Sequence, residues 1–403
     1  MPTDSPIHIG DLRAYGRLAV DATLGVTGVV EHMHRNILRL PWPVGAAVDT
    51  PTGGISGLVY RSIRGITRGV GTGLDAALAL LPVDAARAGD SSRRDALLAA
   101  LNGVVGDRLL ATDSPLRIEM RLRHDGRPLP LERDSLAKAL PGATGRIVVV
   151  VHGLCMGDRQ MRRNGHEHGA ALAVDAGYTP VHLHYNSGLR IADNGRAFAD
   201  RLEALVRAWP VEVERLSLLG YSMGGLLVRS ACSHARRERH AWLAHLRDIV
   251  YLGTPHTGSP LERGGQRLDA LLGASPYTAA LSRLGKLRSV GITDLREADL
   301  GGDAGRLPRG VRTHAIAGCI ARNSNASHDR LLGDGLVPLD SALGLHADPA
   351  RSLRIPTTRR WIAQGLHHLD LLDDPGVYRK LLGWLSQAPG PSRRAAAGSA
   401  VAR

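Results

Sequence analysis

The spacing of hydrophobic residues changes near residue 115. Before this point, apolar residues recur every three or four positions, which predicts amphipathic helices. These helical stretches lie at about 10–40, 56–82 and 92–111. After it, residues 116–122 alternate apolar and charged side chains, and the following Asp125-Gly126 pair is typical of a hairpin turn. The chain therefore changes from a helical to a strand-containing pattern at this point.

The second part of the chain alternates strand and helix patterns. Residues 146–151 form a continuous β-branched run, which is typical of a central strand that is buried on both faces. Further strands are expected at 178–184, 214–219, 248–252, 311–317 and 353–356. Helices are expected between them at about 160–176, 193–208 and 223–237. This alternation predicts an α/β fold with a mostly parallel central sheet and flanking helices.

The same patterns divide the chain into parts. Residues 1–114 are expected to form a helical N-terminal extension, which either packs on the rest of the chain or lies on a membrane or lipid surface. Residues 115–386 are expected to form one α/β domain, and within it residues 258–307 interrupt the alternation in the manner of a cap or lid insertion. The tail, 387–403, is rich in Pro, Ala, Arg and Ser and is expected to be disordered.

Composition and charge narrow the class of protein. Hydrophobic residues make up 43% of the 403 residues, which is ordinary for a globular protein. The net charge is +13, and the arginines that dominate it are scattered rather than gathered on one element beside aromatic residues. We therefore expect no nucleic-acid partner. The positive charge is at least as compatible with an anionic membrane surface as with a nucleic acid.

Cysteine usage and the N-terminal pattern indicate where the protein works. Cys155, Cys232 and Cys319 are isolated from one another, which argues against a disulfide framework and fits a reducing compartment. The N-terminal residues lack the basic and apolar regions of a secretion signal, and no uncharged apolar run is long enough to span a bilayer. The expected location is the cytoplasm, with peripheral membrane association through the N-terminal helices as an addition.

Residues 220–224, Gly-Tyr-Ser-Met-Gly, carry the strongest chemical signal. They follow the apolar run 216–219 and precede a helical pattern. A Gly-x-Ser-x-Gly between a strand and a helix is the nucleophile elbow of serine hydrolases. The turn is so sharp that side chains two residues before and after the serine would collide, so glycine is needed at both places. Ser222 is therefore the candidate nucleophile.

A serine nucleophile needs a base and an acid that orients the base. In the hydrolases that carry this elbow, the chain order is Ser, Asp, His, so the base should lie late in the chain. His367 and His368 both follow the last expected strand, and either could serve. The acid is expected after the strand 311–317, where Asp334 between two glycines is the first candidate and Asp329 the second.

The oxyanion hole needs two backbone amides that point at the developing negative charge. One amide is expected from Met223, directly after the nucleophile. The other is expected from Leu154, because Gly153 allows a tight reversal at the end of the strand 146–151. His152 is then expected to be a structural hydrogen-bonding residue.

The remaining histidines offer other interpretations. His166 with His168, and His182 with His184, have a spacing that two metal ligands can share, but no further ligand motif accompanies them. We therefore expect polar roles near the pocket for them, and no metal or organic cofactor. His256 comes too early in the chain to be the base and is expected to shape the pocket.

Five segments taken together resemble one family, the α/β-hydrolases of the bacterial lipase and GPI inositol-deacylase-like group. The segments are His152-Gly153-Leu154, 220–225, 252–259, 334–338 and His368-Leu369-Asp370. The resemblance covers about 145–385 and implies that His368 is the base and Asp334 the acid. The asparagine that this group has before its catalytic histidine is His367 here. Residues 1–115 lie outside the resemblance.

These features predict a carboxylic-ester hydrolase of the lipase or esterase type. Ser222, Asp334 and His368 would form its triad, with Leu154 and Met223 as oxyanion donors and an acyl-enzyme intermediate. The expected partner is an ester or lipid substrate. Two alternatives are an acyltransferase that uses the same triad, and a non-catalytic protein that binds a membrane or lipid surface through its N-terminal segment.

Overall fold

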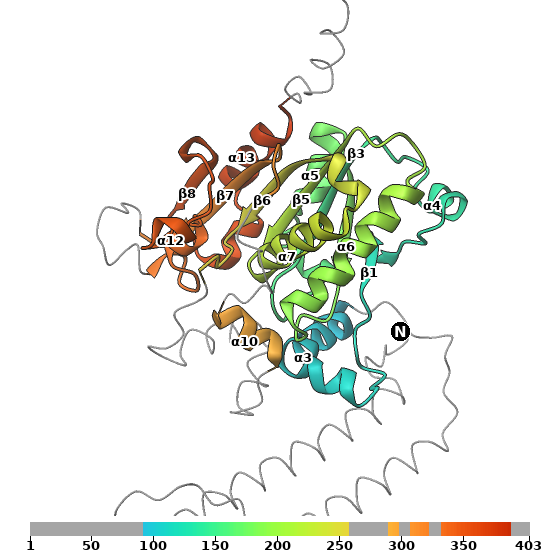
Figure 1. The fold of residues 1–403 in the computed structure, drawn as a ribbon, viewed down its shortest axis with the longest axis horizontal. Helices are drawn as coiled ribbons and strands as arrows, with labels where there is room; N and C mark the ends of the chain where they lie inside the picture. Colours follow the sequence, from blue (N-terminus) through green and yellow to red (C-terminus); the bar gives the residue numbers. More distant parts are fainter. Residues whose placement is uncertain (1–91, 258–288, 298–306, 322–331, 388–403) are drawn as a thin grey trace, which may run out of the picture. The chain divides into compact units, whose positions relative to one another are not determined.

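The computed structural model describes residues 92–257, 289–297, 307–321 and 332–387 (Figure 1). The helices expected at 10–40 and 56–82, most of the expected cap and the tail from 388 lie outside these residues. The chain divides into two compact units, one formed by Met1–Arg94 with Thr112–Leu116 and the other by Asp95–Ala111 with Arg117–Arg403. The fold and the site described below belong to the second unit.

An eight-stranded sheet with the order β2-β1-β4-β3-β5-β6-β7-β8 forms the centre of this unit. Strand β1 pairs antiparallel with β2 and β4, and all other neighbours are parallel. The predicted mostly parallel sheet is therefore confirmed. The strands are β1 (Arg121–His124), β2 (Arg127–Pro128), β3 (Arg146–Val151), β4 (Thr179–His184), β5 (Arg215–Tyr221), β6 (Leu246–Leu252), β7 (Arg312–Cys319) and β8 (Arg360–Gln364).

Helices cover both faces of the sheet, as expected for an α/β-hydrolase fold. In Figure 1, α6 and α7 lie on the face turned towards the viewer, and α5 and α13 pack together behind it. The helices are α3 (Ser92–Ala111), α4 (Arg133–Ala139), α5 (His168–Ala176), α6 (Ile191–Ala208), α7 (Met223–Glu238), α10 (Val290–Glu297), α12 (Leu339–Ala342) and α13 (Pro375–Leu385). Short 3₁₀ turns are η2 (Asp158–Met161), η3 (Ala241–Ala244), η5 (Pro349–Arg351), η6 (Thr357–Arg359) and η7 (His368–Leu372).

The core explains why the central strands are continuously apolar. Residues 147–151 of β3 are almost completely buried because helices cover both faces of the sheet. On the face of α5 and α13, alternate strand residues form one cluster with Leu172 of α5 and Leu381 of α13. This packing holds the carboxyl ends of β3, β5, β7 and β8 at one edge of the sheet, which is where the candidate site lies.

The expected strand at 353–356 is wrong, and the last strand is β8. Pro356 has no amide hydrogen to donate to a ladder. The amide of Ile355 bonds to the carbonyl of Leu353 at 2.8 Å, within the segment itself. The sheet pairing is made instead by residues 360–364, which pair with β7.

The helix expected at 160–176 begins later, at His168. Asn164 and Gly165 adopt positive φ angles of 47° and 82°, and form a tight turn. On either side of this turn, the backbones of Arg163 and His166 exchange two hydrogen bonds of 2.9 Å. The similar Asp125-Gly126 pair, at φ angles of 48° and 75°, makes the expected hairpin between β1 and β2.

Helix α3 belongs to the second unit from Asp95 onward, although the sequence pattern groups it with the N-terminal extension. The side chain of Asn102 accepts a hydrogen bond from the amide of Ile118 at 2.9 Å. Ser289, before α10, donates to the carbonyl of Gly103 at 2.7 Å. Within the described ranges, every helix is too short or too polar to cross a lipid bilayer.

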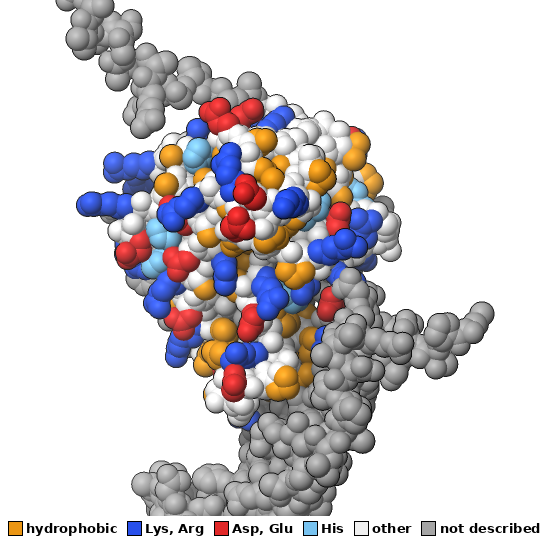
Figure 2. All heavy atoms as spheres, turned by 90° about the vertical axis from the view of Figure 1, so that its right-hand side faces the viewer, with side chains coloured by type: hydrophobic (Ala, Val, Ile, Leu, Met, Phe, Trp, Pro, Cys, Tyr) orange, Lys and Arg blue, Asp and Glu red, His pale blue; other side chains and the backbone are white. Residues whose placement is uncertain are grey.

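Figure 2 shows one face of the molecule with its charged side chains. On this face, Lys and Arg side chains are interspersed with Asp and Glu side chains and with small apolar areas. The positive charge of the described residues is therefore spread over this face, as expected from the scattered arginines.

Candidate active site

Ser222 lies on a sharp turn between β5 and α7. Its φ and ψ angles are 52° and −127°, a combination that a residue with a side chain rarely adopts. Two hydrogen bonds hold the turn: the amide of Ser222 donates to the carbonyl of Leu252 at 2.8 Å, and the amide of Gly225 donates to the carbonyl of Ser222 at 3.0 Å. The fold therefore fixes the serine in a strained conformation at the carboxyl end of β5.

The glycines around Ser222 are required by close backbone contacts. A Cβ atom on Gly220 would lie 2.6 Å from the Cα atom of Gly225. A Cβ atom on Gly224 would lie 2.4 Å from the carbonyl oxygen of Val151, at the end of β3. The turn can approach β3 this closely only because these positions carry no side chain, as the sequence pattern predicts.

His368 and Asp334 are hydrogen-bonded to each other in a buried position. The Nδ1 atom of His368 lies 2.6 Å from Oδ2 of Asp334, and the two residues are 2% and 1% exposed. The other oxygen of Asp334 accepts the amides of Leu336 and Val337 at 3.0 and 2.8 Å. A Cβ atom on Gly318, near the end of β7, would lie 2.8 Å from that of Asp334. The glycine therefore makes room for this carboxylate.

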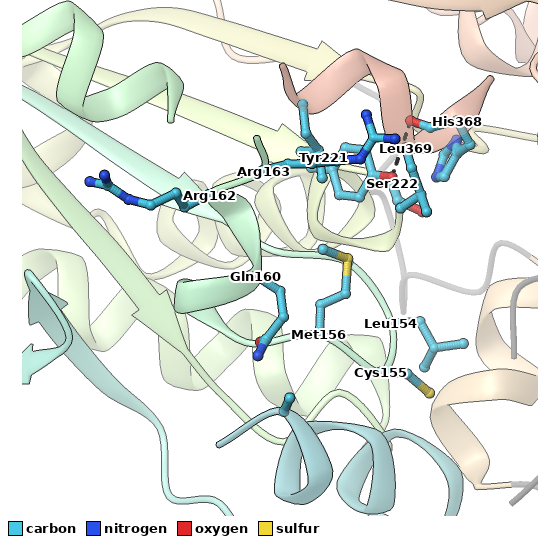
Figure 3. A pocket seen from close by; sticks show the side chains of 13 residues that line it. Leu154, Cys155, Met156, Gln160, Arg162, Arg163, Tyr221, Ser222, His368 and Leu369 are labelled. Carbon is cyan, nitrogen blue, oxygen red and sulfur yellow. Dashed lines mark hydrogen bonds between the residues drawn. The ribbon is translucent and has the colours of Figure 1, made fainter. Parts of the chain in front are cut away.

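The second ring nitrogen of His368 makes no hydrogen bond to the described protein, and the residue lines a cavity. This Nε2 atom is buried. Because Nδ1 faces a carboxylate, it carries the hydrogen, and the lone pair of a neutral ring then lies on Nε2. The ring of Tyr221 packs against the imidazole at 4.9 Å, and its hydroxyl donates to the carbonyl of His368 at 3.2 Å. Figure 3 shows His368, Tyr221 and Ser222 grouped at one end of the cavity.

The two candidate oxyanion donors flank Ser222. The loop after β3 passes so close that a Cβ atom on Gly153 would lie 3.0 Å from the Cβ atom of Ser222. Leu154 follows in this loop and lines the cavity, and Met223 is the first residue of α7. Within the described part of the chain, neither of their amides makes a hydrogen bond to the protein. Both amides can therefore donate to a bound oxyanion.

The loop after β3 that carries Leu154 is the candidate oxyanion loop. Helix α3 and Ser187 contact this loop at Cys155. Cys155 has a positive φ angle of 59°, and its amide donates to the hydroxyl of Ser187 at 3.0 Å. A Cβ atom on Gly103 of α3 would lie 2.3 Å from the sulfur of Cys155. Burial raises the pKa of this thiol to about 12, so it stays protonated at neutral pH. Cys155 therefore supports the loop and is not a competing nucleophile.

The cavity beside Ser222 has a volume of about 240 Å³ (Figure 3). Its lining residues are Ala96, Gly153, Leu154, Cys155, Met156, Gln160, Arg162, Arg163, Tyr221, Ser222, His368, Leu369 and Leu372. The sequence analysis did not indicate Ala96, Gln160 or Arg163 as part of this lining. In Figure 3, the side chain of Arg162 points away from the group around Ser222. Apart from the group around Ser222, the polar side chains of the lining are those of Gln160, Arg162 and Arg163.

Arg163 connects the loop before α5 to the segment that carries His368. Its Nη1 atom lies 2.5 Å from Oδ1 of Asp373 and 3.1 Å from Oδ1 of Asp370. The side-chain amide of Asn164 donates to the other oxygen of Asp373 at 2.6 Å. These contacts join residues about 210 positions apart in sequence. They hold η7, and with it His368, against the cavity wall.

His152 has the structural role that the sequence suggested. Its ring is completely buried, and its Nδ1 atom lies 2.9 Å from the carbonyl oxygen of Gly153. Burial lowers the pKa of His152 to about 3, so the ring is neutral at pH 7. It stacks on Tyr185 with 4.3 Å between ring centres. The ring therefore braces the backbone on which the oxyanion loop depends.

The two His-x-His pairs are engaged separately. On β4, His182 lies 3.4 Å from Glu167, while His184 lies 3.0 Å from Asp158. The pair before α5 bonds internally, with 2.8 Å between Nε2 of His166 and Nδ1 of His168. The two histidines of β4 are therefore each paired with a carboxylate, and the two before α5 are hydrogen-bonded to each other.

His256 lies outside the residues that line the cavity. The guanidinium of Arg229 donates to its carbonyl at 3.2 Å, and its ring packs edge-on against Tyr251 at 4.5 Å. Burial lowers the pKa of His256 well below its usual value, so its ring is neutral. Asp329, the second candidate for the acid, lies outside the described residues.

Several solved structures of lipases and esterases are similar to this chain at low sequence identity. No curated protein sequence matches the chain. Among solved structures, the mature lipase BlEst2 of Bacillus licheniformis is 17% identical, with a TM-score of 0.43 and coverage of 67% of this chain and 98% of that one. Aspergillus fumigatus lipase B is 14% identical, with a TM-score of 0.39 and coverage of 68% and 57%. A Pyrococcus furiosus esterase is 13% identical, with a TM-score of 0.40 and coverage of 60% and 82%.

A family model gives the most specific comparison. Residues 142–300 match the PGAP1-like alpha/beta domain. The matched range begins just before β3 and includes the elbow with Ser222. This match confirms the resemblance to α/β-hydrolases of the lipase and GPI inositol-deacylase-like group over residues 142–300.

Proposed function

We propose that the protein is a carboxylic-ester hydrolase of the esterase or lipase type. One observation carries this proposal. Nδ1 of His368 lies 2.6 Å from Asp334, Nε2 has no hydrogen-bond partner among the described residues, and His368 and Ser222 line the same cavity. A serine on a strained elbow, a base with a free nitrogen and a buried carboxylate are the parts of an acyl-transfer site.

The arrangement supports a two-step reaction. The Oγ atom of Ser222 attacks the ester carbonyl as Nε2 of His368 takes its proton, and Asp334 stabilises the imidazolium. The carbonyl electrons move onto the oxygen, where the amides of Leu154 and Met223 donate to it. When the intermediate collapses, His368 returns the proton to the departing alcohol and an acyl-serine forms. Water then attacks the acyl-serine with His368 as base, and the carboxylic acid leaves.

The cavity supports an ester with an apolar acyl part. Leu154, Met156, Leu369 and Leu372 contribute apolar side chains to its lining. Apolar walls favour a hydrocarbon chain, because its removal from water stabilises the complex. A lipid or a small ester with an aliphatic acyl group is therefore the proposed substrate.

An active-site probe tests this function directly. A fluorophosphonate reacts with an activated serine and adds one phosphonyl group, which intact-mass measurement detects. We expect one adduct on the wild-type protein and none on Ser222→Ala, together with hydrolysis of p-nitrophenyl esters by the wild type alone. An unlabelled wild-type protein, or equal ester cleavage by Ser222→Ala, would overturn the proposal. Adding alcohol acceptors and analysing the products separates hydrolysis from acyl transfer.

A further inference from the structure

Two histidines and one aspartate meet on the surface between α6 and α7. Asp200 belongs to α6, His234 belongs to α7, and His240 follows the end of α7. One ligand atom from each residue lies within 4.8 Å of the other two. None of the three lines the cavity at Ser222. The group is therefore separate from the candidate active site.

The end of α7 brings His240 back towards His234. Helix α7 ends at Glu238, and Arg239 adopts a left-handed conformation with φ and ψ of 58° and 40°. This conformation reverses the chain, and the amide of His240 donates to the carbonyl of Ala235 at 2.9 Å. The two rings then meet edge to face, with 5.7 Å between their centres. Both side chains are mostly buried, at 14% and 13% exposed.

The backbone orients the ring of His240. Its Nδ1 atom lies 3.3 Å from the carbonyl oxygen of Ala199. A carbonyl can only accept, so Nδ1 carries the hydrogen and the lone pair lies on Nε2, which faces Asp200. Histidines that bind metals show this arrangement, because a hydrogen bond from the other ring nitrogen fixes the tautomer.

The distances in this group are longer than hydrogen bonds and close to those of a metal site. Oδ1 of Asp200 lies 3.9 Å from Nε2 of His234 and 3.6 Å from Nε2 of His240, which is beyond the usual hydrogen-bonding range. Ligand atoms bound tetrahedrally to zinc at about 2.0–2.1 Å stand roughly 3.3 Å apart. Small side-chain rotations would therefore bring all three atoms into coordination range.

We propose that Asp200, His234 and His240 form a binding site for a divalent transition metal, with Zn²⁺ as the ion that best matches two imidazoles and a carboxylate. Water completes the coordination, since the side chain of Asp200 is 61% exposed. A bound ion would tie α6 to the end of α7, the helix that starts at the elbow of Ser222. An ion that binds only the folded state raises its stability.

Zinc titration of the untagged, metal-free full chain tests this site. We expect one high-affinity Zn²⁺ ion per chain by isothermal titration calorimetry. The midpoint of thermal unfolding should rise with ZnCl₂, stay unchanged with MgCl₂ and fall back with EDTA. Asp200→Asn and His240→Gln should each weaken Zn²⁺ binding by more than about tenfold, since each removes one of three ligands.

His124 provides a matched control within the same chain. Its Nδ1 atom lies 2.7 Å from the carbonyl oxygen of Pro180, and its Nε2 atom lies 3.6 Å from Asp125. Like His240, His124 has one ring nitrogen at a backbone carbonyl and the other near an aspartate, but it lacks the second imidazole that His234 supplies to His240. His124→Gln should therefore bind Zn²⁺ like the wild type. Equal Zn²⁺ affinity of the wild type and His240→Gln would overturn the proposal. Fluorophosphonate labelling of Ser222 tests the catalytic proposal separately.

Discussion

Asp334 faces His368 through one carboxylate oxygen and is held by two backbone amides through the other. The contact with Nδ1 of His368 measures 2.6 Å, and the amides of Leu336 and Val337 lie at 3.0 and 2.8 Å. The carboxylate therefore cannot turn away without losing hydrogen bonds in a buried position. This fixed geometry is the basis of the first prediction.

Replacing Asp334 by Asn should nearly abolish ester hydrolysis. An amide in this position favours the wrong tautomer of His368 and cannot stabilise the imidazolium, and the equivalent change in a serine protease lowers kcat by about 10⁴-fold. We expect a loss of roughly 10³- to 10⁴-fold in kcat, with KM much less affected. Steady-state kinetics checks this, with circular dichroism as the control for folding. A variant that retains a tenth of the wild-type kcat would contradict the assignment.

Neighbouring histidines allow a paired test of the base. His368 is 2% exposed and reaches both Asp334 and the cavity, whereas His367 is exposed and precedes the first turn of η7. His368→Ala should abolish fluorophosphonate labelling of Ser222, because the nucleophile loses its base. His367→Ala should label at a rate close to that of the wild type. The opposite result would assign the base to His367.

The candidate catalytic residues could be chosen from the sequence because they follow strands of one parallel sheet. Ser222 follows β5, Asp334 lies in the loop after β7, and His368 follows β8. Carboxyl ends of parallel strands meet at one edge of a sheet, so the linear order already implied proximity. The glycine pattern at 220–224 added the elbow, since only glycine tolerates its backbone contacts. The last strand is formed by residues 360–364 instead of the expected 353–356, but His368 still follows it at the same edge of the sheet.

Contacts between distant segments could not be predicted in the same way. Arg163 contacts Asp373, about 210 positions later in the sequence. Gly103 lies against Cys155, although the sequence pattern grouped Gly103 with the N-terminal extension. Neither pair has a local signal, because only the folded chain brings its members together. The Asn164-Gly165 turn did carry a local signal, which the surrounding helical periodicity obscured.

The contact between α3 and the oxyanion loop predicts an effect at a distance from Ser222. A Cβ atom on Gly103 would lie 2.3 Å from the sulfur and 2.8 Å from the backbone nitrogen of Cys155. Gly103→Ala must therefore displace the loop and the amide of Leu154. Loss of one oxyanion donor lowers kcat by about 10²- to 10³-fold, so we expect a decrease of up to this size.

A second helical glycine serves as the control for this experiment. A Cβ atom on Gly383 of α13 would meet no atom within 4 Å. Gly383→Ala should therefore leave kcat unchanged and stabilise the fold by up to about 1 kcal/mol, because alanine favours helix more than glycine does. If both variants keep the wild-type kcat, α3 does not position the oxyanion loop.

A buried ion cluster near the opposite edge of the sheet should control stability in acid. Asp248 of β6 is completely buried and lies 2.6 Å from Arg215, 2.9 Å from Arg312 and 3.3 Å from His314. Burial alone would raise the pKa of Asp248, but hydrogen bonds from these three side chains outweigh it and lower the pKa to about 2. The carboxylate is therefore more acidic in the folded protein than in the unfolded chain.

Stability should accordingly fall between pH 4 and pH 2. A depressed folded-state pKa contributes stability that is present above the unfolded value near 3.9 and is lost as the pH falls through the folded value. This contribution is about 2–3 kcal/mol at neutral pH. Asp248→Asn should lower the free energy of unfolding by about 3–5 kcal/mol at pH 6, because Arg215 then stays buried without its carboxylate. Urea unfolding at pH 6 and at pH 3 measures both effects.

Because the variant no longer titrates at this position, its stability should fall less steeply in acid than that of the wild type. An equally steep decrease in both proteins would mean that other carboxylates cause the acid sensitivity.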